Sequence, residues 1–130
     1  VVAREAFGAG TEIEHRSRGY NTLADISVIV LVNNGSASAS EILAGALRDQ
    51  RGIKLVGTKT YGKGSVQELV GVTEETSLKV TIARWLTPSG VSLSENGLDP
   101  DMVVEMTPED MENMRDPQID RALEILRGTE

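Results

Sequence analysis

Three serines, Ser36, Ser38 and Ser40, stand where an apolar segment gives way to a helical pattern. A sharp turn from a strand into a helix exposes a side chain and aims helix N–H groups at the same place, so such a turn suits a nucleophile. The amide of Ala39 could then donate to an oxyanion formed by attack from Ser38. Serine is also a favoured N-cap residue, and from this local pattern alone helix capping is the simpler explanation.

A serine hydroxyl needs a base within hydrogen-bond reach before it attacks a carbonyl. His15 is the only histidine, and its polar surroundings predict a surface position. Because the chain has no cysteine and no convincing histidine, lysine becomes the leading base. A lysine base needs a pKa about three units below the reference value of roughly 10.4, which burial away from carboxylates provides.

Lys63 fits that requirement best, since it stands between Gly62 and Gly64, where backbones can approach closely. Gln67 follows it by four residues, a spacing that places both side chains on one face of a helix or a strand. The Gln67 amide could therefore hold the amine in place without charging it. The remaining lysines are weaker candidates; they are Lys54, Lys59 and Lys79.

The segment 57–64 nearly matches the phosphate-binding loop in which Gly-Lys precedes Ser or Thr. Gly64 replaces the hydroxyl residue that would hold magnesium, and residues 65–70 alternate like a strand where a helix should begin. These departures argue against nucleotide binding. With one histidine and no cysteine, the chain predicts no metal site and no cofactor. Glu41 is expected only to favour the helix dipole from the first turn.

A βαβ unit is predicted around the serines. Residues 26–32 form a β-branched run that predicts a central strand buried on both faces, and residues 41–49 repeat apolar side chains at helical spacing. Small residues in this helix would let it lie close against a sheet. A second buried strand at residues 53–56 completes the unit and predicts a partly parallel sheet.

Residues 65–70 and 77–85 alternate in strand fashion and predict a hairpin, followed by a turn at residues 87–90. Thr107 predicts the N-cap of a helix, and a final helix is expected from an apolar stripe made of Ile119, Ala122, Leu123 and Leu126. The first 25 residues are expected to contain a helix remnant followed by an edge segment.

Composition bounds the other possibilities. The 130 residues are 39% apolar, which predicts one domain, and the start at valine predicts an excised piece of a longer protein. Because no apolar run is long enough to span a membrane and no signal-peptide pattern is present, the piece itself is expected to be soluble and to carry no targeting segment. The net charge is −7; residues 1–98 hold ten acidic and ten basic side chains, and residues 99–130 hold ten acidic and three basic. This balance argues against a nucleic-acid partner.

The segments 33–42 (NNGSASASEI) and 59–67 (KTYGKGSVQ) strongly resemble the carboxyl-terminal processing peptidases, also called tail-specific proteases. Residues 87–90, 97–101 and 116–123 are similar to that family's core as well, so the resemblance covers about residues 26–127. It implies Ser38 as nucleophile, Lys63 as base and Gln67 as the residue that orients the lysine. Ala39 would supply one oxyanion amide.

The resemblance further implies an α/β, crotonase-like core with a mixed, partly parallel sheet and flanking helices. The family's PDZ domain and its other oxyanion segment should lie upstream, so residues 1–130 are expected to form the C-terminal part of a catalytic domain, incomplete and inactive alone. The implied activity is cleavage of proteins near apolar C-termini outside the cytoplasm, in the periplasm or cell envelope. An exported or membrane-associated parent and a homo-oligomer are compatible with it. The alternative is a non-catalytic interaction domain on the same scaffold.

Overall fold

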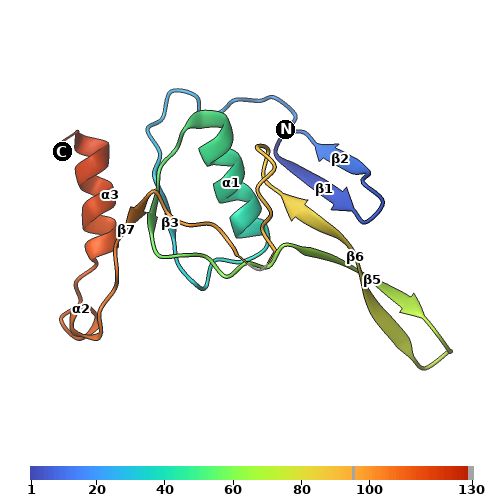
Figure 1. Cartoon of the computed structure of the whole chain (residues 1–130). Coiled ribbons are helices and arrows are strands. Elements are labelled where there is room, and N and C mark those ends of the chain that lie inside the picture. The colour runs from blue at the N-terminus through green and yellow to red at the C-terminus, as the bar shows by residue number, and fades with distance from the viewer. Residues whose placement is uncertain (95, 129–130) are drawn as a thin grey trace.

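The computed structural model describes residues 1–94 and 96–128, so Glu95 and the last two residues of the expected 1–130 domain lie outside the described residues. The described residues form seven strands and three helices, whose arrangement Figure 1 shows. In chain order the elements are β1 (Ala3–Phe7), β2 (Glu12–His15), β3 (Val30–Val32), α1 (Ala39–Arg51), β4 (Leu55–Gly57), β5 (Ser65–Gly71), β6 (Ser77–Leu86), β7 (Met102–Val103), α2 (Pro108–Glu112) and α3 (Pro117–Arg127).

The strands form two sheets. One is antiparallel with the order β2-β1-β6-β5, and the other is parallel with the order β3-β4-β7. Helix α1 lies between these sheets, and α3 lies at the far side of the parallel sheet (Figure 1). The predicted α/β fold with parallel and antiparallel strands and flanking helices is confirmed, with the two kinds of pairing separated into two sheets.

The predicted βαβ unit is present as β3, α1 and β4, with β3 and β4 parallel. Small residues on α1 permit close packing, as expected: a Cβ atom on Gly45 would lie 2.8 Å from the Thr87 methyl carbon. Gly52 ends the helix in a left-handed conformation and donates to the carbonyls of the last turn. This unit places the start of α1 just beyond the carboxyl end of β3.

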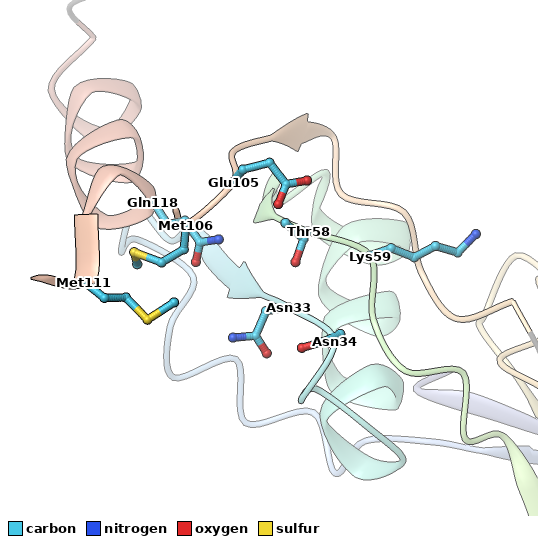
Figure 2. A pocket seen from close by; sticks show the side chains of 8 residues that line it. All are labelled: Asn33, Asn34, Thr58, Lys59, Glu105, Met106, Met111 and Gln118. Carbon is cyan, nitrogen blue, oxygen red and sulfur yellow. The ribbon is translucent and has the colours of Figure 1, made fainter. Parts of the chain in front are cut away.

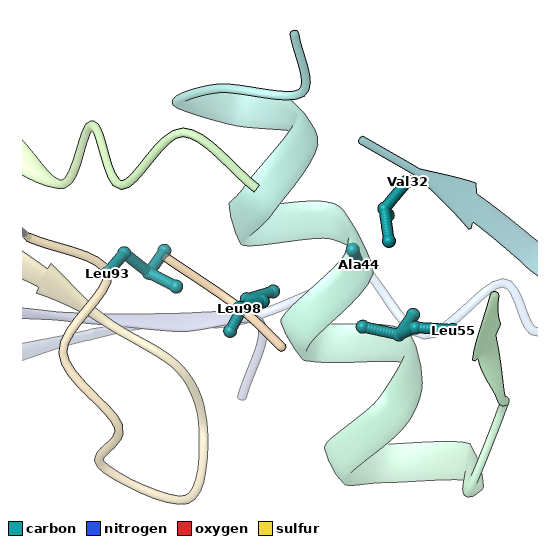
Figure 3. Close-up of a cluster of buried hydrophobic side chains, with 5 residues drawn as sticks. All are labelled: Val32, Ala44, Leu55, Leu93 and Leu98. Carbon is teal, nitrogen blue, oxygen red and sulfur yellow. The ribbon is translucent and has the colours of Figure 1, made fainter. Parts of the chain in front are cut away.

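The buried core packs α1 against the parallel sheet on one side and against the loop after β6 on the other. Its centre contains Val32, Ala44, Leu55, Leu93 and Leu98, with Trp85 packed against it (Figure 3). Leu93 and Leu98 come from the loop after β6, and they pack beside α1 although they belong to no long element. Burial of these side chains therefore fixes that loop against the helix.

The expected hairpin is confirmed as β5 and β6, which project from the body of the chain (Figure 1). Its register shifts between Val66 and Gln67, at a bulge near the start of β5. The predicted turn at residues 87–90 is also present, closed by a 2.9 Å hydrogen bond from the Gly90 amide to the Thr87 carbonyl.

Two predictions about the first third of the chain are wrong. The expected helix remnant is instead a hairpin of β1 and β2, in which β2 supplies the expected edge segment. The predicted central strand at 26–32 is reduced to β3, which has a strand neighbour on one side only among the described residues. Ile26 is 54% exposed and Leu31 is 42% exposed. An apolar segment becomes buried only where another element packs over it.

Both predicted C-terminal helices are present. Thr107 caps α2 and shares a capping box with Asp110, while Asp116 caps α3. In the predicted stripe on α3 only Ala122 is buried; Ile119, Leu123 and Leu126 remain partly exposed in this chain. None of the described helices has the length and apolar character needed to cross a membrane.

Candidate active site

Ser38 occupies a strained turn between β3 and α1. It is the N-cap residue of the helix, with φ 56° and ψ −115°, and its hydroxyl makes no capping hydrogen bond. A positive φ is uncommon for a residue other than glycine, and such strain often marks functional positions. The side chain is exposed. Backbone geometry therefore presents the Ser38 hydroxyl to solvent at a helix start, as expected for a nucleophile.

The Ala39 amide and the Ser36 hydroxyl, on either side of Ser38, have different hydrogen-bonding surroundings. Ala39 opens α1, so its amide belongs to the first turn, where N–H groups have no intrahelical acceptor. That amide is free to stabilise a negative charge beside Ser38. The hydroxyl of Ser36 is engaged differently, because it accepts a 3.2 Å hydrogen bond from the Asn33 amide within the preceding turn.

Glu41 is the most buried charged residue of the site, with 0% of its surface exposed. Its Oε2 atom accepts hydrogen bonds of 2.9 Å from the amides of Ser38 and Lys63. Its Oε1 atom accepts from the Thr60 hydroxyl at 2.5 Å and from the Gly62 amide at 2.8 Å. One carboxylate therefore holds the serine turn and the lysine loop together, a larger role than the dipole effect expected from sequence.

This arrangement brings the backbones of Ser38 and Lys63 close. Both amide nitrogens lie 2.9 Å from the same oxygen atom, so they are separated by at most twice that distance. A further link is the 3.0 Å hydrogen bond from the Tyr61 amide to the Ser36 carbonyl. The structure does not join the Ser38 hydroxyl to the Lys63 amine by a hydrogen bond. Such contacts often tighten only when substrate is bound.

The loop that carries Lys63 is fixed at Gly64. The carbonyl of Gly64 accepts a 2.6 Å hydrogen bond from the Trp85 amide. A Cβ atom at this position would lie 2.5 Å from the backbone nitrogen of Ser94, so only glycine fits without a shift. The expected close approach of backbones is confirmed. The expected burial of the Lys63 side chain is not found, because the packing buries Gly64 and leaves Lys63 exposed.

Gln67 makes no hydrogen bond to Lys63 in the structure. Its amide Nε2 donates to the Thr81 hydroxyl on β6 at 3.4 Å. Thr81 and Lys63 line the same cavity of about 400 Å³, which Arg84 also borders. Gln67 thus contacts one residue of that cavity, and its direct contact with the lysine amine stays a prediction.

The other candidate bases have different surroundings. Lys59 lies 3.3 Å from Asp99 and Lys54 lies 4.0 Å from Asp101, so both are engaged with carboxylates. No ion pair to Lys63 occurs among the described residues. His15 is exposed as predicted, in β2, where it contacts Glu5 at 3.1 Å.

The nucleotide-binding alternative is not supported by the fold. A phosphate-binding loop leads into a helix whose N-terminal amides hold the phosphates. Here Lys63 and Gly64 lead directly into β5, an edge strand of the antiparallel sheet. The first helix that follows this loop in the described residues is α2, after residue 107.

Sequence reasoning missed the network around Glu41. The spacing of Ser38 and Glu41 matches the capping-box pattern, and that pattern predicts the contact from the Ser38 amide to the Glu41 carboxylate. Nothing local predicts that Thr60 and Gly62 would share the same carboxylate, because those contacts depend on how the loop after β4 folds back. Thr60 is 5% exposed and also accepts from the Leu98 amide at 2.7 Å, so it extends the network to the core.

Known proteins are similar to this chain in sequence. The model of the family described as "Peptidase family S41" matches residues 2–104. A carboxy-terminal-processing protease of Bartonella bacilliformis is 53% identical over 78 residues, which are 60% of this chain and 18% of that protein. A carboxyl-terminal-processing protease of Synechocystis sp. is 39% identical over 122 residues, which are 92% of this chain and 28% of that protein.

Solved structures agree. A photosystem II D1 C-terminal processing protease matches with a TM-score of 0.73 and 36% identity, over 85% of this chain and 29% of that one. The tricorn protease matches with a TM-score of 0.61 and 25% identity, over 75% of this chain and 10% of that one. The chain spans less than a third of the length of each of these relatives.

Proposed function

This chain belongs to peptidase family S41, and from that premise we propose that it carries the nucleophile and the base of a serine peptidase, Ser38 and Lys63. The observation that carries the proposal is the Glu41 Oε2 atom, which binds the backbone amides of both residues. Two segments distant in sequence are thereby held at one place, where a hydroxyl and an amine are the reactive side chains.

In the proposed reaction the Ser38 hydroxyl oxygen attacks the carbonyl carbon of a peptide bond while the neutral Lys63 amine accepts the hydroxyl proton. The Ala39 amide donates to the oxyanion, and a second donor lies outside the described residues. Lys63 then returns the proton to the leaving amine as the carbon–nitrogen bond breaks. Water, activated by the same amine, hydrolyses the ester on Ser38.

Gln67 is proposed to orient Lys63, since its amide reaches Thr81 on the wall of the cavity that Lys63 lines. We further propose that residues 1–130 form the C-terminal part of the catalytic domain, and that the segments which grip the substrate and cover Lys63 lie outside them. The exposed Lys63 side chain supports this, because a lysine base works best shielded from water.

Substrates and location are carried over from relatives. Two of these are called carboxyl-terminal processing proteases, and one from Tetradesmus obliquus is called chloroplastic. We propose protein substrates with apolar C-termini, an extracytoplasmic setting for the parent and a capacity to form homo-oligomers. The exposed lysine is the one observation that favours the alternative, an interaction domain that binds such tails without cutting them.

The test uses the intact parent protein and a quenched fluorescent peptide with an apolar C-terminus. We expect Ser38→Ala, Lys63→Ala and Lys63→Arg each to abolish cleavage, since arginine keeps its proton, and expect the double variant to lose no more than either single one. Gln67→Ala should be milder, and Ser40→Ala should retain activity. Appreciable turnover in Ser38→Ala or Lys63→Arg would refute the assignment, and peptide binding without cleavage by the wild type would favour the interaction domain.

A further inference from the structure

A second cavity lies beside the serine turn, at the carboxyl ends of the parallel strands (Figure 2). Its volume is about 700 Å³. Asn33 directly follows β3, Thr58 directly follows β4, and Glu105 comes two residues after β7. Ligands of open parallel sheets bind in the crevice outside these strand ends. The location alone therefore marks the cavity as a candidate binding site, and none of the proposed catalytic residues lines it.

The polar lining of this cavity is mixed, because its asparagine and threonine side chains can both donate and accept, and Glu105 is its one carboxylate. The Glu105 carboxylate has no ion pair and no hydrogen bond among the described residues. The Gln118 side chain belongs to a residue only 8% exposed, and its Nε2 donates to the Val104 carbonyl at 2.8 Å. That bond leaves the Gln118 Oε1 atom, an acceptor, without a described partner.

The one cationic side chain of the lining does not neutralise these acceptors. Lys59 pairs with Asp99, with 3.3 Å between its amine and the carboxylate. Figure 2 shows its side chain extending away from Glu105. A positively charged ligand group would therefore meet an unpaired carboxylate, whereas a negatively charged one would meet it as a repulsion.

The remaining wall is apolar and adaptable. Met106 precedes α2 and Met111 belongs to it, and both side chains line the cavity (Figure 2). Methionine is flexible and polarisable, and it suits surfaces that receive side chains of varied shape. A ligand with an apolar stem and a cationic end would bury its stem against the methionines and reach Glu105 with its charge.

We propose that this cavity is a specificity subsite that binds a lysine or arginine side chain of the protein substrate. The proposal rests on the proposed peptidase function. Asn34, on the cavity rim, precedes Ser38 by four residues, so the two Cα atoms lie at most about 14 Å apart. An extended substrate covers that distance in about four residues. The basic residue therefore lies within about four positions of the scissile bond.

The test compares peptides that carry lysine or methionine at one position at a time, up to four residues on either side of the cleavage site, using the intact parent. At one position we expect kcat/KM to be about fivefold higher for lysine than for methionine. Glu105→Gln should reduce that ratio to about one. Glu105→Lys should reverse the preference in favour of a glutamate peptide.

Glu112→Gln is the matched control, because Glu112 is an exposed carboxylate on α2 that does not line the cavity. It should keep the lysine preference. If the wild type cleaves the methionine peptides and prefers lysine nowhere, or if the preference survives Glu105→Gln, the subsite is refuted while the peptidase function stands. If no peptide is cleaved, the function fails. Fluorescence anisotropy of the same peptides on the intact protein then decides the subsite by its own lysine-to-methionine binding ratio.

Discussion

The amides of Ser38 and Lys63 donate to the same Oε2 atom of Glu41, each at 2.9 Å. The contact couples the turn after β3 to the loop before β5, which belong to different sheets. Any displacement of that carboxylate changes the position of both reactive residues at once. Glu41 is thus a positioning residue in the proposed reaction, and it touches neither substrate nor reacting atoms.

Replacing Glu41 is expected to reduce both stability and rate. Glu41→Ala would leave three amides and the Thr60 hydroxyl without their acceptor in a fully buried place, at a cost of about 3 kcal/mol or more in the free energy of unfolding. Glu41→Gln keeps one acceptor atom and should cost less. In both variants kcat should fall more than KM changes, because substrate contacts are retained.

Melting temperature and steady-state kinetics on the intact parent measure these effects. Glu74→Ala provides the control, since Glu74 is an exposed glutamate in the hairpin turn. A Glu41→Gln protein with unchanged kcat would show that the shared carboxylate does not position the site.

Gly64→Ala is expected to lower activity and stability together, because its Cβ atom would lie 2.5 Å from the backbone nitrogen of Ser94. Backbone atoms cannot move aside cheaply, so the Lys63 loop must shift. Gly71→Ala is the matched control at the other end of β5, where a Cβ atom meets nothing within 4 Å. Kinetics and thermal melts of both variants check this expectation. Equal behaviour of the two proteins would contradict it.

Asp49 is expected to make the free energy of unfolding depend on pH in the acidic range. Partial burial raises the pKa of this carboxyl, but hydrogen bonds from Thr87 and Ser89 and the charge of Arg48 outweigh it and hold the pKa below its ordinary value of 3.8. A group with a lowered pKa stabilises the fold fully above its ordinary pKa, and this contribution is lost as the pH falls through the lower, folded-state pKa.

Asp49→Asn should therefore cost stability at neutral pH, by about 1 kcal/mol, and the difference from wild type should shrink below pH 4. Urea unfolding at a series of pH values measures it. Asp25→Asn, at an exposed aspartate elsewhere in the chain, is the control substitution. A difference that stays constant down to about pH 2 would be inconsistent with the contacts between Asp49 and the 87–90 turn.

The isolated chain, residues 1–130, is expected to fold and to cleave peptides at a small fraction of the parent's rate. Loss of one oxyanion donor alone costs about 10²- to 10³-fold. Lys63 is also exposed in this chain. Circular dichroism and peptide cleavage, measured beside the intact parent, provide the test. Cleavage by the isolated chain at the parent's rate would disprove the idea that essential parts lie elsewhere.

Local patterns predicted the elements that depend on near neighbours in sequence. The helix predicted at 41–49 and the strand predicted at 53–56, from apolar spacing and β-branched runs, correspond to α1 and β4, and the Thr107 cap follows from a short motif. The prediction of a fully buried strand at 26–32 was wrong because an apolar composition indicates a tendency to be buried and does not specify which element would cover the segment. Only residues 30–32 have a strand beside them here.

In the candidate site, too, local features could be predicted from the sequence, whereas contacts between distant segments could not. The turn at Ser38 was predictable because the order of strand, turn and helix is local, and the close backbone packing beside Lys63 was predictable because glycines flank it. The convergence of Thr60 and Gly62 on Glu41 was not, since a carboxylate in a first helical turn usually faces water or the helix dipole. Burial of that carboxylate depends on a loop whose path is set by Leu93 and Leu98 packing elsewhere in the core.

The backbone of Ser38 sets stability against activity at one position. With φ 56° and ψ −115°, the turn favours glycine, and a side chain there costs about 1–3 kcal/mol. Ser38→Gly should then melt above both wild type and Ser38→Ala while cleaving nothing. The most stable form of this fold would be an inactive one, so the free energy stored in the turn must be supplied by the rest of the domain.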